Sequence, residues 1–272
     1  MIIAQISDLH VKPPGQKAYG VVDTNGFVAR AIAHLNRLDP PPDIVIATGD
    51  LVDGGTAEEY AQLKALLADL NMPVYLAMGN HDDRAALRQS FPEHGYLQSA
   101  RMQAPVQYVV DNYPVRLVVL DTVVPGEGYG LMDQARLSWL DQQLARNPAK
   151  PTIVFMHHPP FRTKIDAMDG IMCQGGDALA ELISMYTNVE RVACGHLHRS
   201  IQTRWARTIG AIAPSVAHQV TLALRPHQPI GFSYEPPGFY LHVWEEAMGL
   251  VTHTVAIGTF EAYSYATKER LR

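Results

Sequence analysis

Short, nearly continuous apolar runs most strongly constrain the fold of this 272-residue chain. They cover residues 2–6, 44–47, 74–78, 153–156 and 192–194. Runs of this length without polar alternation are typical of strands buried on both faces of a sheet. Amphipathic stretches lie between them, at residues 25–38, 57–70, 133–146 and 177–185. This succession of strand and helix predicts an α/β protein.

The middle and the end of the chain have a different pattern. Residues 106–110 and 116–120 flank the turn sequence Asp111-Asn112-Tyr113-Pro114, which predicts a hairpin. Later strand-like segments follow at 201–205, 208–212, 240–244 and 250–255. Residues 225–238 are rich in proline and glycine, and we expect a loop or arm there.

Composition narrows the class of protein. The formal net charge is -5, from 22 basic and 27 acidic residues, which argues against a dedicated nucleic-acid binder. The two cysteines, Cys173 and Cys194, are expected to be free thiols rather than a disulfide framework. No apolar run reaches about 18 residues, and Asp8 interrupts the N-terminus before a signal sequence could form. We therefore expect no membrane partner and, by default, a cytoplasmic location.

Polar side chains follow five of the predicted strands at the point where each strand ends. The segments are Asp8-Leu9-His10, Gly49-Asp50, Gly79-Asn80-His81-Asp82, His157-His158-Pro159 and Gly195-His196-Leu197-His198. In open α/β sheets, sites form beyond the carboxyl ends of the strands. We therefore expect these side chains to converge in space.

The residue types indicate a metal site. Carboxylates supply anionic oxygens and can bridge two cations, imidazoles suit transition metals, and the Asn80 amide oxygen ligates without adding charge. A set with nitrogen and oxygen but no sulfur favours Mn, Fe, Zn or Co over a cysteine-rich structural zinc site. Each segment alone has an ordinary reading, as a cap, a turn or a surface pair. Five of them at successive strand ends are hard to explain in that way.

In this order, the five segments resemble the metallophosphoesterase (calcineurin-like) superfamily over residues 8–198. Within it, the chain looks most like the bacterial glycerophosphodiesterases and the class III cyclic nucleotide phosphodiesterases. That finer resemblance is carried by Met156-His157-His158-Pro159-Pro160, by the overall length, and by residues 216–220. It implies one domain over residues 1–272, folded as a four-layer α/β/β/α sandwich with two mixed β-sheets. It also implies that residues 200–240 form a cap or an oligomerisation arm, and that the protein is a homo-oligomer, a dimer or higher.

The same resemblance implies residue roles. Asp8, His10 and His198 would hold one divalent metal ion, Asn80, His157 and His196 would hold the other, and Asp50 would bridge them. His81 would donate a proton to the leaving group; the alternative is that it only orients Asp82 or the loop. His218 would contact substrate; the alternative is a packed loop histidine. We expect His158 to order His157, and Asp82 and Asp121 either to support the ligands or to cap local backbone.

The predicted function is a binuclear metal-dependent phosphodiesterase that hydrolyses small phosphodiesters, such as glycerophosphodiesters, through a metal-activated hydroxide. The alternatives are a 3′,5′-cyclic nucleotide phosphodiesterase, or a broad enzyme that also takes monoesters. A nuclease is disfavoured by the acidic balance. A non-catalytic metal-binding scaffold is disfavoured because the full ligand set and His81 are present.

Overall fold

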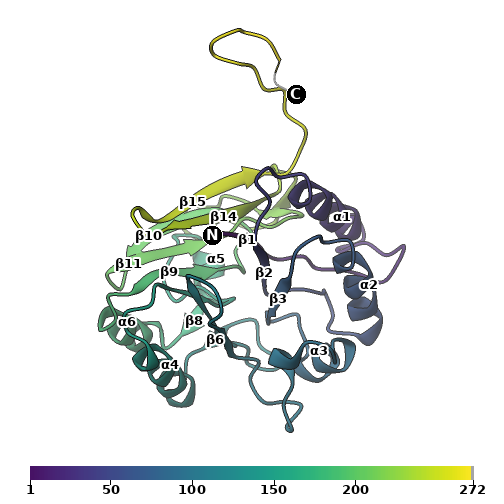
Figure 1. Cartoon of the computed structure of the whole chain (residues 1–272). Helices are drawn as coiled ribbons and strands as arrows, with labels where there is room; N and C mark the ends of the chain where they lie inside the picture. Colours follow the sequence, from purple (N-terminus) through teal and green to yellow (C-terminus); the bar gives the residue numbers. More distant parts are fainter. Residues whose placement is uncertain (271–272) are drawn as a thin grey trace.

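The computed structural model describes residues 1–270 and contains two mixed sheets packed face to face, with helices on their outer sides (Figure 1). The first sheet has the strand order β15–β14–β1–β2–β3, and the second has the order β10–β11–β9–β7–β5–β4. The predicted four-layer sandwich with two mixed sheets is confirmed. No helix within residues 1–270 is long and apolar enough to cross a bilayer.

The first sheet contains the N-terminal strands. β1 (Ile2–Ile6), β2 (Ile44–Thr48) and β3 (Val74–Ala77) run parallel. β14 (Gly238–Glu245) pairs antiparallel with β1, and β15 (Gly249–Ala256) pairs antiparallel with β14. Helices α1 (Thr24–Leu35), α2 (Ala57–Leu67) and α3 (Arg84–Ser90) lie along its outer side (Figure 1). This half of the molecule therefore joins the two ends of the chain in one sheet.

The second sheet is built from the middle of the chain. Its members are β4 (Tyr108–Val110), β5 (Arg116–Val119), β7 (Thr152–Phe155), β9 (Val189–Cys194), β10 (Ile201–Trp205) and β11 (Thr208–Ile212). Helices α4 (Gln134–Arg146) and α6 (Gly176–Ser184) cover it, with the short helix α5 (Asp166–Asp169) nearby. Two small strand pairs complete the fold, β6 (Gly130–Leu131) with β8 (Cys173–Gln174), and β12 (Gln219–Val220) with β13 (Phe232–Ser233).

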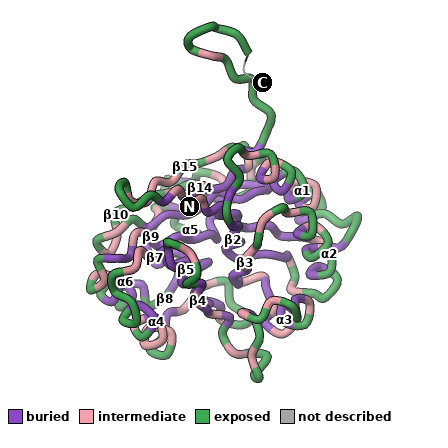
Figure 2. The backbone as a smooth tube through the Cα atoms, in the orientation of Figure 1, coloured by how far each residue is buried: buried purple, intermediate pink, exposed green. Residues whose placement is uncertain are grey.

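The buried strands explain why their sequences do not alternate. In β7, Ile153 and Phe155 belong to the cluster between the sheets, whereas Val154 packs with Leu140 of α4 and Leu179 of α6 on the opposite face. Both faces of the strand are therefore covered, and Figure 2 shows buried backbone throughout the centre of both sheets. Burial of this apolar area is the main favourable contribution to folding.

The helices begin where local hydrogen bonding favours it. Thr56 and Glu59 form a reciprocal capping box at the start of α2, and the side chains of Asp23, Asp83 and Asp133 cap α1, α3 and α4. The predicted helices at 25–38 and 57–70 were each extended about three residues too far at the C-terminal end. The strands predicted at 201–205 and 208–212 are confirmed as β10 and β11.

Residues 200–240 therefore divide into two parts. The first forms two strands of the second sheet, and the remainder leaves that sheet and continues through β12 and β13 toward the site described below. Residues 257–270 extend away from the two sheets (Figure 1). The role of residues 200–240 as a cap or an oligomerisation arm stays a prediction.

Candidate metal centre

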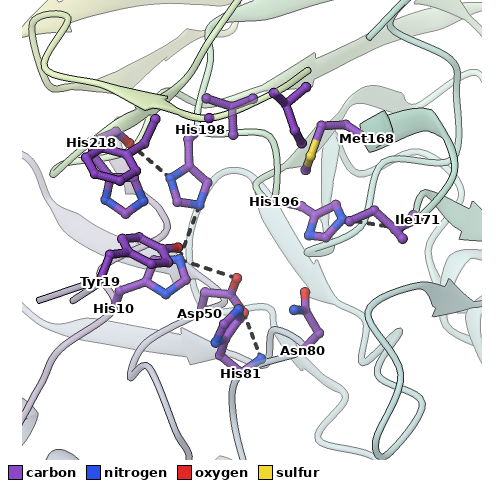
Figure 3. A pocket seen from close by; sticks show the side chains of 14 residues that line it. His10, Tyr19, Asp50, Asn80, His81, Met168, Ile171, His196, His198 and His218 are labelled. Atoms are coloured by element: carbon purple, nitrogen blue, oxygen red, sulfur yellow. Dashed lines mark hydrogen bonds and ion pairs between the residues drawn. The ribbon is translucent and has the colours of Figure 1, made fainter. Parts of the chain in front are cut away.

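The predicted ligand residues lie together at one edge of the two sheets (Figure 3). Asp8 and His10 follow β1, Asp50 follows β2, and Asn80 follows β3. The remaining three, His157, His196 and His198, follow β7 and β9 of the second sheet. Because these parallel strands all end at the same edge, residues up to 190 positions apart in sequence become neighbours.

The backbone at these strand ends is unusual. Asp8, His10, Asp50, His196 and His198 all have positive φ angles, between 46° and 74°. Such left-handed conformations are uncommon for non-glycine residues, although Asp and His are among the more tolerant. They are held in place by hydrogen bonds between the loops, including His10 N to Asp50 O at 2.9 Å and His196 N to the Asp8 carboxylate at 3.0 Å.

Two glycines allow the loops to approach one another. A Cβ atom at Gly49, where φ is +90°, would lie 2.4 Å from His157 Nδ1. A Cβ atom at Gly79 would lie 2.2 Å from the Asp50 backbone nitrogen and carboxylate. At Gly79, which does not have a positive φ angle, close packing against Asp50 is the reason for a glycine.

One group of ligand atoms comes from Asp8, His10, Asp50 and His198, which are all buried and lie within 4.8 Å of one another. His10 Nε2 lies 3.2 Å from His198 Nε2 and 3.6 Å from the Asp50 carboxylate. His198 Nε2 lies 3.5 Å from Asp8 Oδ1. This is a compact set of two imidazoles and two carboxylates.

A second group lies on the other side of Asp50. His157 Nε2 is 3.3 Å from Asp50 Oδ2 and 3.1 Å from Asn80 Oδ1. The ring of His196 packs edge-on against that of His157, with centroids 5.0 Å apart. Asp50 Oδ2 therefore lies near both groups, which is the position that a bridging carboxylate would require.

The imidazoles are oriented so that one nitrogen of each faces this space. The Nδ1 atoms of His10, His157 and His198 hydrogen-bond to the Asp53 carboxylate, Thr48 O and His218 O, at 3.2, 2.9 and 3.0 Å. Each bond places the proton on Nδ1 and leaves an Nε2 lone pair for a metal. Asp8 Oδ2 is buried without a hydrogen-bond partner. Free imidazole nitrogens and an unpartnered carboxylate oxygen fit divalent cations.

Charges in the site are strongly coupled. Burial opposes ionisation of both Asp50 and His157, yet their mutual attraction outweighs it. As a result, the pKa of Asp50 lies well below its usual range and that of His157 rises to about 9. In the metal-free protein His157 therefore carries a second proton, on Nε2 facing Asp50, which a bound cation would displace. Burial, reinforced by neighbouring histidines, lowers the pKa of His196 and His198 to about 3. These two rings are therefore neutral at pH 7, as metal ligation requires.

The two candidate catalytic histidines line a cavity of about 270 Å³ beside these ligands. His81 lies with its ring centroid 4.7 Å from that of His10, and its Nδ1 donates to Asp53 O at 2.7 Å. His218 lies on the other side, 4.6 Å from the His198 ring. Both side chains face the same cavity as Asp50 and Asn80 (Figure 3).

The residues expected to support the ligands act in different ways. Asp82 accepts hydrogen bonds from Gly79 N, Leu51 N and the Tyr60 hydroxyl, and so fixes the loops after β2 and β3. Asp121 instead forms a two-bonded ion pair with Arg84, away from the ligands. His158 hydrogen-bonds to the Thr122 hydroxyl at 2.7 Å, and its ring packs 4.8 Å from that of His157.

Asp53 was missed in the sequence. Its carboxylate orients His10, its backbone carbonyl orients His81, and it also pairs with Lys12 at 3.0 Å. The available signal was its place three residues after Asp50, in Gly49-Asp50-Leu51-Val52-Asp53.

Comparison with known proteins identifies the family. The family described as Calcineurin-like phosphoesterase matches residues 1–200, more than half of the chain. The protein belongs to the calcineurin-like phosphoesterase family. Its predicted resemblance is thus confirmed.

Relatives of this calcineurin-like phosphoesterase are named as phosphodiesterases. A probable glycerophosphodiester phosphodiesterase GpdQ of Arcobacter nitrofigilis is 40% identical, over 96% of this chain and 95% of the relative. A probable cyclic nucleotide phosphodiesterase of Rhodopseudomonas palustris is 35% identical, over 91% and 89%. Among solved structures, a dimetal phosphatase from Danio rerio shares the fold, with a TM-score of 0.66 at 15% identity, covering 95% of this chain and 99% of that one.

Proposed function

We propose that this calcineurin-like phosphoesterase is a dimetal phosphodiesterase that hydrolyses small phosphodiesters such as glycerophosphodiesters. The observation that carries the proposal is the position of the Asp50 carboxylate, 3.6 Å from His10 Nε2 and 3.3 Å from His157 Nε2. One shared anion between two oriented ligand groups is typical of a two-metal hydrolytic site. The relatives named as glycerophosphodiester phosphodiesterases support the choice of substrate.

Each ligand residue has a definite part. Asp8, His10 and His198 would hold one cation, Asn80, His157 and His196 would hold the other, and Asp50 would serve both. Two divalent cations in such a site lower the pKa of bound water and stabilise the attacking and leaving oxygens of an in-line displacement. Mn, Fe, Zn and Co all accept this donor set. Asp53 and Thr48 keep His10 and His157 in the orientation that ligation needs.

The two cavity histidines handle the substrate. His81 Nδ1 is committed to Asp53 O, so Nε2 is the atom available to protonate the departing alkoxide. Its side chain is 35% exposed, so it can reach a bound ester and exchange protons with solvent. His218 lies across the cavity and contacts the phosphate or its ester group. A homo-oligomeric assembly, a dimer or higher, and a cytoplasmic location complete the proposal.

A cyclic nucleotide phosphodiesterase is the second candidate. Several relatives carry that name, including one that is 35% identical over 91% of this chain. A cyclic nucleotide is also a phosphodiester, so the same ligand residues and His81 would serve it. The two candidates differ only in what the cavity wall accepts.

The test is a rate ratio. Protein stripped of metal and reloaded with Mn²⁺ is assayed on bis(p-nitrophenyl) phosphate and on p-nitrophenyl phosphate, with Asp50→Ala as the inactive control. We expect a metal-dependent preference for the diester. A preference for the monoester would reassign the enzyme as a phosphomonoesterase. Absence of turnover with Mn, Fe, Zn and Co alike would favour a non-catalytic metal-binding scaffold.

A further inference from the structure

The cavity beside the ligands has two chemically different walls. One wall carries Asp50, Asn80 and the histidines. The other is apolar and consists of Tyr19, Met168, Ile171, Val220, Ile230 and Phe232. None of the residues lining the cavity, within the part of the chain that the structure describes, is a lysine or an arginine.

A small hairpin supplies much of the apolar wall. We call residues 219–235, which include β12 and β13, the β12–β13 flap. Its strands pair at Val220 and Phe232, and Thr221 N donates to Gly231 O at 2.9 Å. Arg199, the residue after the last ligand, ties the flap down by donating to Val220 O and pairing with Glu235 at 2.8 Å. The flap is therefore fastened directly to the ligand loop.

Aromatic stacking joins the flap to the N-terminal half of the molecule. The ring of Phe232 stacks on that of Tyr19, with centroids 5.2 Å apart and planes 16° apart. Both rings also pack edge-on against His218, at 5.7 and 5.3 Å. The candidate substrate-contacting histidine is thus framed by apolar surface on the side away from the ligands.

The apolar surface continues from the cavity to solvent. On the flap, Ile230 is 41% exposed, and Leu222 and Leu224 are 55% and 56% exposed. Tyr19 and Val21 are exposed as well, on the loop that faces the flap. Tyr19, Ile230 and Phe232 both line the cavity and are exposed, and apolar surface of this kind beside a cavity is typical of a binding surface.

The apolar wall bears on the alcohol groups that are esterified to the phosphate of the substrate. The apolar wall offers no lysine or arginine, so the part of the substrate that lies against it is expected to be uncharged. Apolar side chains gain free energy by covering hydrocarbon, at about 0.8 kcal/mol for each CH₂ fully buried. A cavity of about 270 Å³ holds the phosphate and a few carbon atoms. A longer chain would continue over the flap.

Building on the proposed function, we propose that this site is selective for phosphodiesters in which one alcohol carries an apolar chain. That chain lies along Tyr19, Phe232 and Ile230 and leaves the cavity over the flap. Another occupant for the same surface is a second copy of this chain. We favour the substrate because the apolar wall is continuous with the interior of the cavity, next to the ligands.

The experiment measures chain length against rate. Methyl, butyl and octyl p-nitrophenyl phosphates, below their micelle concentrations, are hydrolysed by the Mn²⁺-loaded protein. We expect kcat/KM to rise about two- to threefold for each CH₂ up to butyl, because the chain is only partly buried, and more slowly beyond. Phe232→Ala and the milder Ile230→Ser should each reduce this dependence. Met185→Ser, which removes an exposed apolar side chain at the end of α6, should leave it intact.

A binding measurement separates this inference from the proposed function. Titration calorimetry with methyl, butyl and octyl phosphate, the products of those reactions, should give affinities that rise with chain length and an increasingly negative heat-capacity change. Affinities that rise with alkyl chain length, without any turnover, would overturn the proposed reaction but support the apolar binding site. Hydrolysis of the methyl ester with no chain dependence would overturn the apolar site alone.

The competing occupant gives its own result. If a second copy covers the flap, Leu222→Ser with Leu224→Ser should lower the mass measured by sedimentation, and the chain-length dependence should be absent in the unmutated protein. That combination would overturn the substrate assignment. A mass that the two changes leave unaltered, with a chain-length dependence that they reduce, would support it.

Discussion

The buried histidines at the metal edge differ from the buried His242 in how many of their ring nitrogens are hydrogen-bonded to protein groups outside the ligand set. At the metal edge, the Nδ1 atom of each ligand histidine named here hydrogen-bonds to a protein oxygen, and Nε2 faces the other ligands; these histidines are His10, His157 and His198. Between the sheets, both ring nitrogens of His242 of β14 are hydrogen-bonded, Nδ1 with Thr252 Oγ1 at 2.7 Å and Nε2 with Gln5 Oε1 at 3.0 Å.

The difference shows how function can be distinguished from packing. His242 is complete within the fold, since a neutral ring can donate to Gln5 and accept from Thr252. The edge histidines are incomplete, because their free nitrogens face one another and a carboxylate rather than donors. Asp8 Oδ2 at the same edge is buried without a hydrogen-bond partner, and because burying such a group is costly, a cation at this edge would be stabilising. Burial alone would not have separated the two sets, as all four rings are buried.

The largest effect is expected from Asp50→Ala, which removes the group shared by both sets of ligands. Activity on bis(p-nitrophenyl) phosphate should fall by more than about 1000-fold, beyond the 10–100-fold typical of residues that only orient a ligand. Metal analysis after gel filtration should show that both ions are loosened. Asp177→Ala, at an exposed acid on α6, serves as the control. Full activity with two bound ions would disprove the bridging role.

His81→Ala should preserve metal binding, because His81 is placed beside the ligands rather than among them. The rate should fall by about 10²–10⁴-fold for an alkyl leaving group, which needs a proton, and much less for p-nitrophenolate. The measurement compares kcat for a glycerophosphodiester and for bis(p-nitrophenyl) phosphate. His253→Ala, at an exposed histidine of β15, is the control. Equal losses on both substrates would argue against proton donation.

Asp53→Asn tests whether the hydrogen bond between His10 Nδ1 and the Asp53 carboxylate is what orients His10 for metal binding. The amide is a weaker acceptor and cannot match the charge of the carboxylate, so Mn²⁺ affinity should fall by about 10–100-fold. Titration of the metal-free protein measures it, with Asp177→Asn as the matched control. Asp53→Glu, which retains the charge, should recover part of the affinity. Unchanged affinity in Asp53→Asn would mean that this acceptor is dispensable.

The smallest effect concerns His242, where the change should appear in stability and not in rate. Burial, assisted by the nearby charge of Arg191, lowers the pKa of His242 to about 3, against about 6.5 for an unfolded chain. The unfolded state therefore binds the extra proton first, and stability is lost as pH falls from about 6.5 toward 3, by roughly 1 kcal/mol per pH unit. His242→Gln should remove this contribution, so that the loss of stability in denaturant titrations of metal-free protein becomes less steep by that amount, while His196 and His198 continue to contribute theirs.

The control for that experiment is His253→Gln on the adjacent strand, where the side chain is exposed. It should keep the full pH dependence. If His242→Gln and His253→Gln gave the same profile, the acid sensitivity would belong to other groups, and the contrast between the two sets of histidines would lose its energetic basis.

Much of the fold could be predicted because buried parallel strands have short apolar sequences and end in loops at one edge. Helix α3 was missed since its buried face includes Arg84 and Arg88, whose guanidinium groups bond to Asp121 and to Leu97 O. Buried arginines break the apolar periodicity on which such predictions depend. The strands of the flap have two residues each, too few for any period to appear.

The ligand residues could be predicted as a group, whereas their surroundings could not. Polar residues at the ends of parallel strands converge because of the topology of the sheet, so the ligand residues could be predicted without a three-dimensional structure. Asp53 lies in the turn sequence Val52-Asp53-Gly54-Gly55, in which aspartate is ordinary. The apolar cavity wall joins Tyr19 to Phe232, which are far apart in sequence and are brought together only by the packing of two loops.

The left-handed backbone at Asp8, His10, Asp50, His196 and His198 also bears on how durable this site is over evolutionary time. Backbone strain of this kind costs of order 1–3 kcal/mol at a residue. Substitutions that relieve the strain would stabilise the metal-free chain while discarding a ligand. A lineage released from selection for hydrolysis should therefore lose these five residues early and keep the sandwich, which makes an intact set a sign of continued use.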